Sequence, residues 1–228
     1  DLKVKNYDDY VNNASDTSVT WLYAAKNPGS WANSLKVCYI DDFADQTIGI
    51  TTTNLGAAGA TIGAGITAAI SGALPGSGST STFTGYLKGI ITGVTTSTAG
   101  TSTIDVKVVS RVSSAGTETQ IDYAEGDSFA SFDTSDTVYM VNSVGVNTSN
   151  TALSTIGTAG TTPATVVDWY DQQTLGLTNS TVYWSTIAPK PGTSVYVDDR
   201  QGHNDQLHIA VVDDNGEVTG IKGNILEK

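Results

Sequence analysis

The sequence predicts an α+β fold that is predominantly β, in which an all-β domain interrupts a discontinuous α+β host domain. Charged residues are frequent at both ends of the chain, whereas Lys88 is the only charged side chain between Gln46 and Ile104. β-branched runs bounded by Gly, Ser and Thr recur through the middle, as is typical of short strands. At 228 residues the chain is long enough for two domains. The expected boundaries are 1–45 and 166–228 for the host domain and 46–165 for a sandwich-like or barrel-like insert.

The two ends carry the strand signals of the host domain. A Pro-Gly pair followed by an anchoring tryptophan predicts a turn, and Leu35–Asp41 then predicts a strand. Near the other end, Leu207–Val212 predicts a second strand. Asn215-Gly216 favours a type I′ turn, because both central positions of that turn need positive φ. Residues Glu217–Ile221 are therefore expected to return antiparallel to Leu207–Val212.

The uncharged middle raises the question of a membrane span. Gly59 and Gly63 have the G-x-x-x-G spacing of packed membrane helices. The stretch Leu55–Leu74 has few large apolar residues and no basic flanks, which disfavours a spanning segment. Its large apolar residues recur every four positions, which predicts the stripe of one short helix packed on the insert. These residues are Ile62, Ile66, Ile70 and Leu74.

The rest of the insert is typical of an all-β domain. Strands are expected at Tyr86–Val94, Thr103–Ser110 and Thr137–Val141, and the second of these alternates apolar and polar residues. Ser/Thr/Gly-rich segments at Thr95–Ser102 and Val146–Thr162 predict exposed connections. The later segment, from Asn147 onward, is expected to form a compliant link back to the host domain.

The charge balance restricts the partners. Acidic residues outnumber basic ones 23 to 11, and the net charge of −12 repels nucleic acid and anionic lipid. We therefore expect no nucleic acid partner and no membrane insertion. The chain starts without Met or a signal peptide and ends directly after a strand-like Asn224–Leu226. These ends lead us to expect a fragment of a longer protein.

The residues offer little for catalysis, cofactors or metals. Gly63–Ala68 fits a G-x-G-x-x-A dinucleotide pattern, but the first acidic residue after it is Asp105, too late for a ribose-binding carboxylate. His203, His208 and a single cysteine, Cys38, are too few and too far apart for a recognisable zinc site. No G-x-S-x-G nucleophile elbow occurs. We therefore expect no catalytic residues, no cofactor and no metal.

Paired acids keep a hydrolase or lyase open as a third class of function. Such chemistry needs two carboxyl groups converging within about 5–10 Å. Adjacent residues of a strand point to opposite faces, and these pairs fall where strands give way to turns, so solvated turn acids are the expectation. The pairs are Asp8-Asp9, Asp41-Asp42, Asp198-Asp199 and Asp213-Asp214.

An ordered series of motifs at the two ends resembles a known family. The series comprises Asn27–Val37, Asp168–Gln173, Tyr183-Trp184, Ala188–Ser194 and Asn204-Asp205, followed by spaced glycines and the final Ile225–Lys228. It is similar to the tail sheath protein of contractile-tailed, T4-like bacteriophages (myoviruses), in particular those of cyanobacteria. The motif positions are Pro28, Gly29, Trp31, Asn33, Asp168, Trp169, Tyr170, Gln173, Trp184, Pro191, Gly192, Asn204, Asp205, Gly216, Gly220, Leu226 and Glu227.

The resemblance implies a non-enzymatic structural subunit of the virion. Such subunits stack in helical rings around the tail tube and shorten at infection, during ejection of the genome. The implied partners are neighbouring sheath subunits, the tail tube, and the baseplate or tail terminator. The implied place of synthesis is the bacterial cytoplasm, and the implied fold is an α+β core with β-rich surface insertions. The helical C-terminal portion of the family is not in this sequence.

A second class of function is a surface adhesion or carbohydrate-binding module. Exposed loops on a β domain, together with Phe83, Tyr86 and Tyr139, would suit sugar rings, because aromatic faces pack against them. The opposing expectation is that these aromatics alternate with β-branched residues as core side chains.

Overall fold

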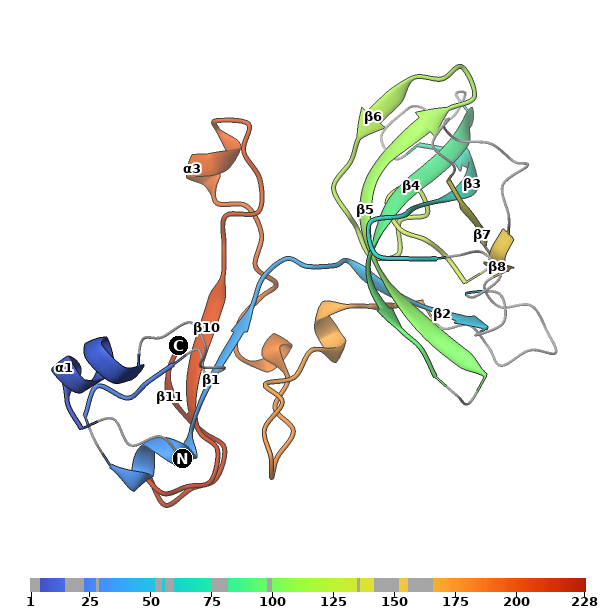
Figure 1. The fold of residues 1–228 in the computed structure, drawn as a ribbon. Coiled ribbons are helices and arrows are strands. Elements are labelled where there is room, and N and C mark those ends of the chain that lie inside the picture. The colour runs from blue at the N-terminus through green and yellow to red at the C-terminus, as the bar shows by residue number, and fades with distance from the viewer. Residues whose placement is uncertain are drawn as a thin grey trace. The chain divides into compact units, whose positions relative to one another are not determined.

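The chain folds into two compact units in the computed structural model (Figure 1). Unit 1 combines Asp1–Asp42 with Gln173–Lys228, and unit 2 is the continuous segment Phe43–Gln172. The fold class is α+β and predominantly β, as predicted, with two antiparallel sheets. The structure describes residues 5–14, 23–27, 29–51, 55, 60–74, 82–97, 100–134, 136–141, 152–155 and 166–228.

Unit 2 is built on one antiparallel sheet of eight strands. Seven strands follow the order β8-β7-β3-β4-β5-β2-β9, and β6 pairs with β5 beside that path. Along the chain they are β2 (Gln46–Thr51), β3 (Gly65–Ala73), β4 (Thr82–Thr95), β5 (Thr101–Ser113), β6 (Glu118–Gln120), β7 (Thr137–Met140), β8 (Ala152–Thr155) and β9 (Val166–Asp168). Among the described residues this unit therefore has one sheet, whereas a sandwich would have two facing sheets.

The alternating pattern of the sequence correctly located three strands of this sheet. β4 and β5 cover the expected runs and extend them at both ends, and β7 starts as expected at Thr137 but ends one residue early, at Met140. In β5 the buried positions alternate strictly from Ser102 to Ser110, so one side of the strand faces the core. The core beneath the sheet contains Ile48, Ile50, Ile66, Ala68, Ile70, Leu87, Ile91, Ile104, Val106, Val108, Phe129, Phe132 and Val138.

The predicted helix with an Ile62–Leu74 stripe is wrong, because Gly65–Ala73 forms strand β3. Ile66 and Ile70 are buried, and so is Ala68 between them. A repeat of four residues is also two periods of a strand, so the spacing alone could not separate the two structures. Gly65 and Gly72 lower helix propensity, and β3 gains full ladders with β4 and β7. The G-x-G-x-x-A match therefore runs into a strand and opens no helix.

β4 bends where its ladder with β5 loses register. The pairing shifts between Lys88 and Gly89 and again between Ile91 and Gly93, and such bulges increase local bend and twist. A Cβ at Gly89 would lie 2.8 Å from Cγ1 of Val106. Only glycine fits this close approach, so the sequence of β4 helps to set the curvature of the sheet.

The end of unit 2 differs from the expected boundary and link. β9 pairs with β2, and the Trp169 amide donates to the carbonyl oxygen of Asp45 at 2.9 Å, so residues 166–172 belong to unit 2. The unit thus runs from 43 to 172, where 46 to 165 was expected. Within the segment predicted as a compliant link, Ala152–Thr155 forms β8 and pairs with β7. The remainder of 147–162 lies outside the described residues.

Unit 1 joins the two ends of the chain in a three-stranded antiparallel sheet, ordered β1-β10-β11. Its strands are β1 (Leu35–Ile40), β10 (His208–Asp213) and β11 (Asn224–Glu227). The predicted strands at 35–41 and 207–212 correspond to β1 and β10, and they pair from Leu35 with Asp213 to Ile40 with His208. The sheet therefore pairs a strand that precedes unit 2 in the sequence with strands that follow it.

The expected hairpin partner at Glu217–Ile221 is wrong. The partner of β10 is β11, which begins at Asn224. Gly216 has positive φ, at 81°, but Asn215 does not, so the expected type I′ turn is wrong as well. The residues after it form a loop because their amides bind a carboxylate, described below, and do not enter a ladder.

Among the described residues of unit 1, helical structure is limited to short turns. They are α1 (Tyr7–Asp9), the π-helical turn η1 (Tyr10–Ala14), the 3-10 turns η2 (Ser30–Ser34) and η4 (Trp184–Thr186), and α3 (Val195–Asp198); the 3-10 turn η3 (Tyr170–Gln172) belongs to unit 2. Trp184 is buried, as are the sheet residues Cys38, Ala210 and Val212. Burial raises the pKa of the Cys38 thiol, as expected for a small buried side chain.

Candidate functional site

Two distant segments of unit 1 meet at the carboxylate of Asp213, at the end of β10. Asp213 is fully buried, although it is charged. Its Oδ1 accepts a hydrogen bond from the Ser34 hydroxyl at 2.5 Å and from the Gly216 amide at 3.0 Å. Its Oδ2 accepts from the amides of Val218 (3.0 Å) and Thr219 (2.7 Å), and from the Thr219 hydroxyl (2.9 Å). This carboxylate therefore holds both η2 and the loop between β10 and β11.

These hydrogen bonds determine the charge state of Asp213. Burial by itself would raise the pKa of this carboxyl, but donors from Ser34, Thr219 and Val218 outweigh burial and hold the pKa well below its usual range. The expectation that Asp213 and Asp214 are solvated turn acids is wrong, because both side chains are buried. An ionised carboxylate with this many donors is a structural anchor, because all of its lone-pair directions are occupied.

Asp214 anchors a third segment at the same place. Its two carboxylate oxygens accept from the Thr178 amide at 2.9 Å and from the Thr178 hydroxyl at 2.7 Å. The Thr178 side chain, together with its amide and with the charge of Lys36, lowers the pKa of Asp214. The Asp214 amide donates to the carbonyl oxygen of Ser34 at 2.7 Å. The pair Asp213-Asp214 thus joins residues 34, 178 and 216–219 into one polar cluster, which we call the Asp213 cluster.

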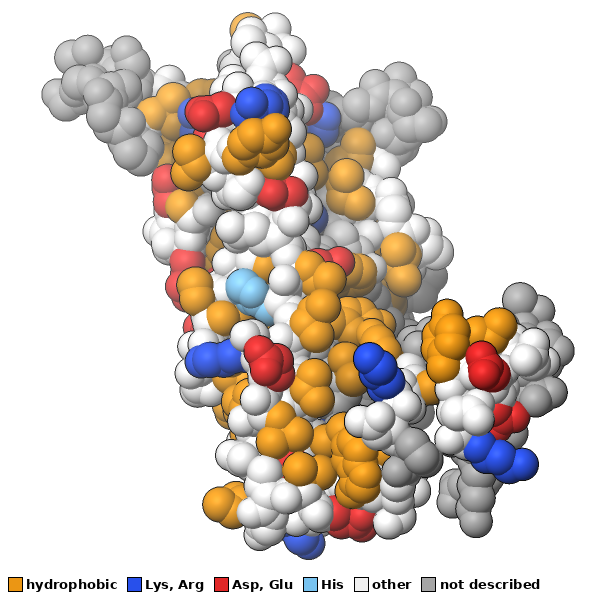
Figure 2. Space-filling model, turned by 90° about the vertical axis from the view of Figure 1, so that its left-hand side faces the viewer, with side chains coloured by type: hydrophobic (Ala, Val, Ile, Leu, Met, Phe, Trp, Pro, Cys, Tyr) orange, Lys and Arg blue, Asp and Glu red, His pale blue; other side chains and the backbone are white. Residues whose placement is uncertain are grey.

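One face of the three-stranded sheet in unit 1 is hydrophobic and open to solvent. Tyr39 and Ile209 are register partners in β1 and β10, and they are 60% and 51% exposed. Their neighbours on the opposite face, Cys38 and Ala210, are buried. The space-filling view in Figure 2 shows hydrophobic side chains gathered between charged ones on the surface that faces the viewer. Such a pattern is typical of surfaces that bind another protein. We call Tyr39 and Ile209 the sheet face.

A loop of unit 1, residues 189–207, carries α3 and is closed at its base (Figure 1). Asp205 accepts from both the amide and the hydroxyl of Ser194, at 2.7 Å each, and these bonds lower the pKa of its carboxyl. The Gly192 amide donates to Oε1 of Gln206 at 3.0 Å. We call this loop the α3 arm. Its base is fixed by these side-chain hydrogen bonds.

The tip of the α3 arm is exposed and partly apolar. Val195 and Tyr196 are 78% and 66% exposed. The Arg200 guanidinium carbon lies 3.8 Å from the centre of the Tyr196 ring, and its Nη1 donates to the Tyr196 carbonyl oxygen at 2.9 Å. Stacking of a cation on an aromatic ring orients both groups. Tyrosine and arginine are the residue types most often found at the centre of protein interfaces.

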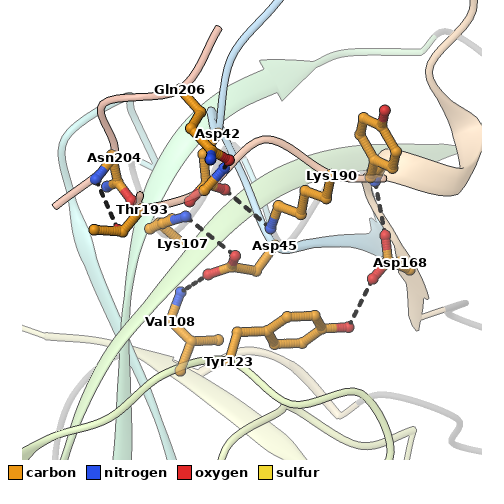
Figure 3. A network of polar contacts seen from close by, with 12 residues as sticks. Asp42, Asp45, Lys107, Val108, Tyr123, Asp168, Lys190, Thr193, Asn204 and Gln206 are labelled. Atoms are coloured by element: carbon orange, nitrogen blue, oxygen red, sulfur yellow. Dashed lines mark hydrogen bonds and ion pairs between the residues drawn. The ribbon is translucent and has the colours of Figure 1, made fainter. Parts of the chain in front are cut away.

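A second polar network lies within unit 2 and closes its two ends (Figure 3). The buried Asp45 carboxylate accepts from the Val108 amide at 2.8 Å and pairs with Lys107 at 3.2 Å. The Tyr123 hydroxyl donates to Asp168 at 3.2 Å. Burial and the nearby Asp168 charge raise the pKa of Tyr123 far above its usual value. These contacts attach Asp45, directly before β2, to β5, and Asp168, in β9, to Tyr123. They therefore favour a role in stabilising the fold of unit 2.

Other contacts in Figure 3 belong to unit 1. Lys190 pairs with Asp42 at 3.0 Å, which fastens the base of the α3 arm to the end of the first segment. The Asn204 amide donates to the Thr193 hydroxyl at 3.0 Å across the same base. His208 places Nε2 at 2.8 Å from the carbonyl oxygen of Pro189, so this histidine is also a structural contact.

The structure distributes the predicted motif residues among several local contacts. Gly216 and Gly220 lie together in the loop around Asp213, where the Gly220 amide donates to the Gly216 carbonyl oxygen at 2.9 Å. Pro191, Gly192, Asn204 and Asp205 share the α3 arm. The Trp184 amide donates to the Gln173 carbonyl oxygen at 3.0 Å. Leu226 and Glu227 are exposed in β11.

Three motif residues are in the other unit. Asp168, Trp169 and Tyr170 belong to unit 2, because β9 pairs with β2; the aromatic pair is buried there, and Asp168 accepts from the Tyr170 amide at 2.8 Å. Near the N-terminus, the Trp31 indole lies against Gly29, where no Cβ would fit, and Asn33 is exposed. Pro28 lies outside the described residues. The motif residues therefore do not form a single site.

The sequence reasoning missed Ser34, Asp45 and Gln46. Each is polar and nearly fully buried, and each bonds residues far away in the chain. Ser34 is separated from Asp213 by 179 positions. Local patterns carry no signal for such contacts. Only the position of each residue directly before or at the start of a strand could have indicated a capping role.

No group of three or more His, Cys, Asp or Glu side chains among the described residues could hold a metal ion. Within the same residues, no helix is long and apolar enough to cross a membrane. No family model matches the chain, and no curated protein or solved structure matches it either.

Proposed function

We propose that the chain is part of a structural subunit of a phage contractile tail sheath. In this role it assembles helically around the tail tube and shortens during genome ejection, without enzymatic activity. Neighbouring sheath subunits, the tail tube and the baseplate or tail terminator are its proposed partners, in a virion assembled in the bacterial cytoplasm. The starting point is the ordered series of end motifs that resembles this family.

The observation that carries the proposal is that β1 pairs with β10, although the whole of unit 2 lies between these two strands in the sequence. An α+β core contributed by separated segments, with a β-rich insertion, is what the resemblance implies for a sheath subunit. Unit 1 has that discontinuous composition, and unit 2 is a continuous β-rich segment. The Asp213 cluster fastens the two segments of unit 1, which suits a rigid body that must transmit force.

Immunogold electron microscopy tests this proposal. Antibodies raised against the recombinant chain are applied to contractile-tailed phages grown on cyanobacteria. We expect labels along the whole tail in extended particles and on the shortened sheath in contracted ones. Serum absorbed with the same recombinant chain is the matched control. Labels confined to heads or fibres, with bare tails, would refute the proposal.

One observation favours surface adhesion as a second candidate. Tyr86 and Tyr139 are half-buried on the outer side of unit 2, flanking β3, where they pair with Ala69 and Thr67. Strand spacing places their Cα atoms roughly 12 Å apart, a span that suits a disaccharide. Phe83 does not join them, because its ring packs edge-on against Phe129 at 6.0 Å.

A glycan array separates adhesion from a purely structural role. Binding of the chain to cyanobacterial surface polysaccharide, lost in both Tyr86→Ala and Tyr139→Ala, would support adhesion. Phe83→Leu, which alters an aromatic on the inner side of the same unit, is the control and should bind as the wild type does. An array without any bound glycan would leave adhesion without support.

A further inference from the structure

The only Asn-Gly pair in the sequence, Asn215-Gly216, lies within the Asp213 cluster. Asn-Gly is the dipeptide in which asparagine deamidates most readily, because glycine has no Cβ to hinder its nitrogen. The Gly216 nitrogen gives up its proton and bonds to Cγ of Asn215, and the bond between Cγ and Nδ2 breaks, so that ammonia leaves with that proton. Water then opens the resulting succinimide ring to aspartate or to isoaspartate. The reaction therefore needs no reagent other than water.

Burial does not protect Asn215 from this reaction, because the residue is exposed. The amides on both sides of its Cα are held by hydrogen bonds instead. The Asn215 amide donates to Oγ of Ser34 at 3.1 Å, and the Gly216 amide donates to Oδ1 of Asp213 at 3.0 Å. The proton that Gly216 must give up is therefore the one that Asp213 binds.

The charge of Asp213 opposes the loss of this proton. A deprotonated Gly216 nitrogen would place a second negative charge at hydrogen-bond distance from a buried carboxylate, where like charges repel strongly. Burial raises the pKa of the Asp213 carboxyl, but its hydrogen-bond donors outweigh burial and hold the pKa well below its usual range. Asp213 is therefore a weak base, and it hinders the reaction more than it assists.

The backbone around Gly216 is fixed at further points. The Gly216 carbonyl oxygen accepts from the Gly220 amide at 2.9 Å. The amides of Val218 and Thr219 donate to Oδ2 of the Asp213 carboxylate, at 3.0 Å and 2.7 Å. The Gly216 amide can therefore leave this carboxylate only when several hydrogen bonds break together. Local openings of this kind are populated only to a small fraction in a folded protein.

We propose that Asn215 is a conditional modification site, protected while the Asp213 cluster is closed and deamidated when the cluster opens. Isoaspartate adds one methylene to the main chain before Gly216, which moves the Gly216 amide away from Asp213. Both products also place a third carboxylate directly after Asp213 and Asp214. A chain that has reacted therefore cannot close the cluster again. This chemistry depends only on the fold of unit 1 and not on the role of the chain in a tail sheath.

The rate of deamidation in the full chain tests the proposal. Folded chain is incubated at neutral pH beside the same chain unfolded in guanidinium chloride at the same pH and temperature. Peptide mass spectrometry, with digestion at mildly acidic pH, measures the fraction of Asn215 that has reacted, and electron-transfer fragmentation distinguishes isoaspartate from aspartate. We expect Asn215 to react at least about tenfold more slowly in the folded chain.

Two variants loosen the cluster in different ways. Asp213→Asn removes the charge that opposes proton loss. Ser34→Ala removes the hydroxyl that bonds both the Asp213 carboxylate and the Asn215 amide, and this milder change serves if Asp213→Asn does not fold. Each variant should raise the rate in the folded chain at least about threefold, because lost hydrogen bonds make opening easier. Hydrogen exchange of β1 shows whether unit 1 is still folded.

Matched controls show whether any weakened contact has the same effect. Asp205→Asn makes the same change at the base of the α3 arm, where the carboxylate also accepts from an amide and a hydroxyl. Gln46→Ala weakens a contact within unit 2. Both controls should leave the rate at Asn215 as it is in the wild type.

Several results would overturn the inference. Asn215 could react as fast in the folded wild type as in the unfolded chain, or as fast in Asp205→Asn as in Asp213→Asn. A slower reaction in Asp213→Asn would show that the carboxylate acts as a general base. Finally, the deamidated fraction is separated by anion exchange and compared by hydrogen exchange. We expect residues 213–220 to lose protection and unit 2 to keep it, whereas full protection of 213–220 would contradict the one-way opening.

Discussion

The side chain of Gln46 allows a quantitative test of how unit 2 is held together. Gln46 begins β2 and is 4% exposed. Its Nε2 donates to the Phe132 carbonyl oxygen at 3.1 Å, and its Oε1 accepts from the Phe132 amide at 2.8 Å. The side chain therefore pairs with a backbone segment as another strand would. Phe132 itself is one of the largest fully buried side chains.

Gln46→Ala should lower the free energy of unfolding of unit 2 by about 2–4 kcal/mol. The estimate follows from two buried backbone groups that lose their partner, each at about 1–3 kcal/mol, with some relief as the segment relaxes. Hydrogen exchange followed by mass spectrometry measures the change in peptides that cover β2 and Phe132. Gln120→Ala, in the exposed strand β6, is the control and should change stability by less than about 0.5 kcal/mol.

Gln46→Glu adds a pH signature to the same test. A carboxylate can accept from the Phe132 amide, but it cannot donate to the Phe132 carbonyl oxygen. The folded state therefore favours the protonated acid and raises its pKa above the unfolded value of about 4.3. The deficit of this variant should be largest near pH 7 and shrink as pH falls toward 4, whereas the deficit of Gln46→Ala should stay constant. A loss under about 0.5 kcal/mol for both variants would refute the assigned role of this side chain.

Three further predictions follow from the contacts. The pKa values of Asp213 and Asp214 are lowered in the folded state, so their stabilising contribution is present above the unfolded pKa of about 3.9 and is lost as pH falls below it. Thermal melts from pH 7 to 2 should therefore show that unit 1 loses stability below about pH 4. In Asp213→Asn this dependence of stability on pH should be weaker. Residues 43–172 expressed alone should fold and give a cooperative melt, because the ladder between β2 and β9 brings both ends of unit 2 together. Gly89→Ala should destabilise unit 2 by about 1–3 kcal/mol, because its Cβ would meet Cγ1 of Val106 at 2.8 Å, while Gly192→Ala, in open space, should be close to neutral in chemical denaturation.

Each of these predictions has a clear contrary result. Stability that is constant or rises on acidification would contradict the ionised state of Asp213. A 43–172 segment that remains unfolded would show that unit 2 depends on unit 1. A Gly89→Ala protein as stable as the wild type would mean that β4 can move away from β5 without cost.

Sequence patterns succeeded where a single period decides the structure. β5 could be predicted because Ile104, Val106 and Val108 alternate with polar residues, and only a strand places them on one side. β3 could not, because a spacing of four suits both a helix and a strand, and its ladders with β4 and β7 decided between them. Asn215-Gly216 predicted a type I′ turn, but only Gly216 has positive φ, and the loop that follows is determined by a buried carboxylate. The burial of Asp213 depends on its contact with Ser34, which is 179 positions away in the sequence. A local sequence pattern cannot predict such a contact.

The same limit of local sequence patterns applies to the aromatic residues of unit 2 and to the α3 arm. The two tyrosines of unit 2 could be named from the sequence, but the inner position of Phe83 depends on Phe129, which comes much later in the chain. The α3 arm was visible only as isolated motif residues such as Asn204 and Asp205. Their shared role emerges when the loop closes and Asp205 meets Ser194.

The bond between Ser34 and Asp213 also fixes the order of events on the ribosome. Ser34 leaves the exit tunnel first and must wait for a partner 179 positions later. At about 5–20 residues per second, that wait lasts roughly 10 to 40 seconds. Unit 2 is fully synthesised during this interval, whereas unit 1 cannot close until its last strand emerges. The strands of unit 2 can therefore pair while the first segment of unit 1 still lacks β10, the strand that completes its sheet.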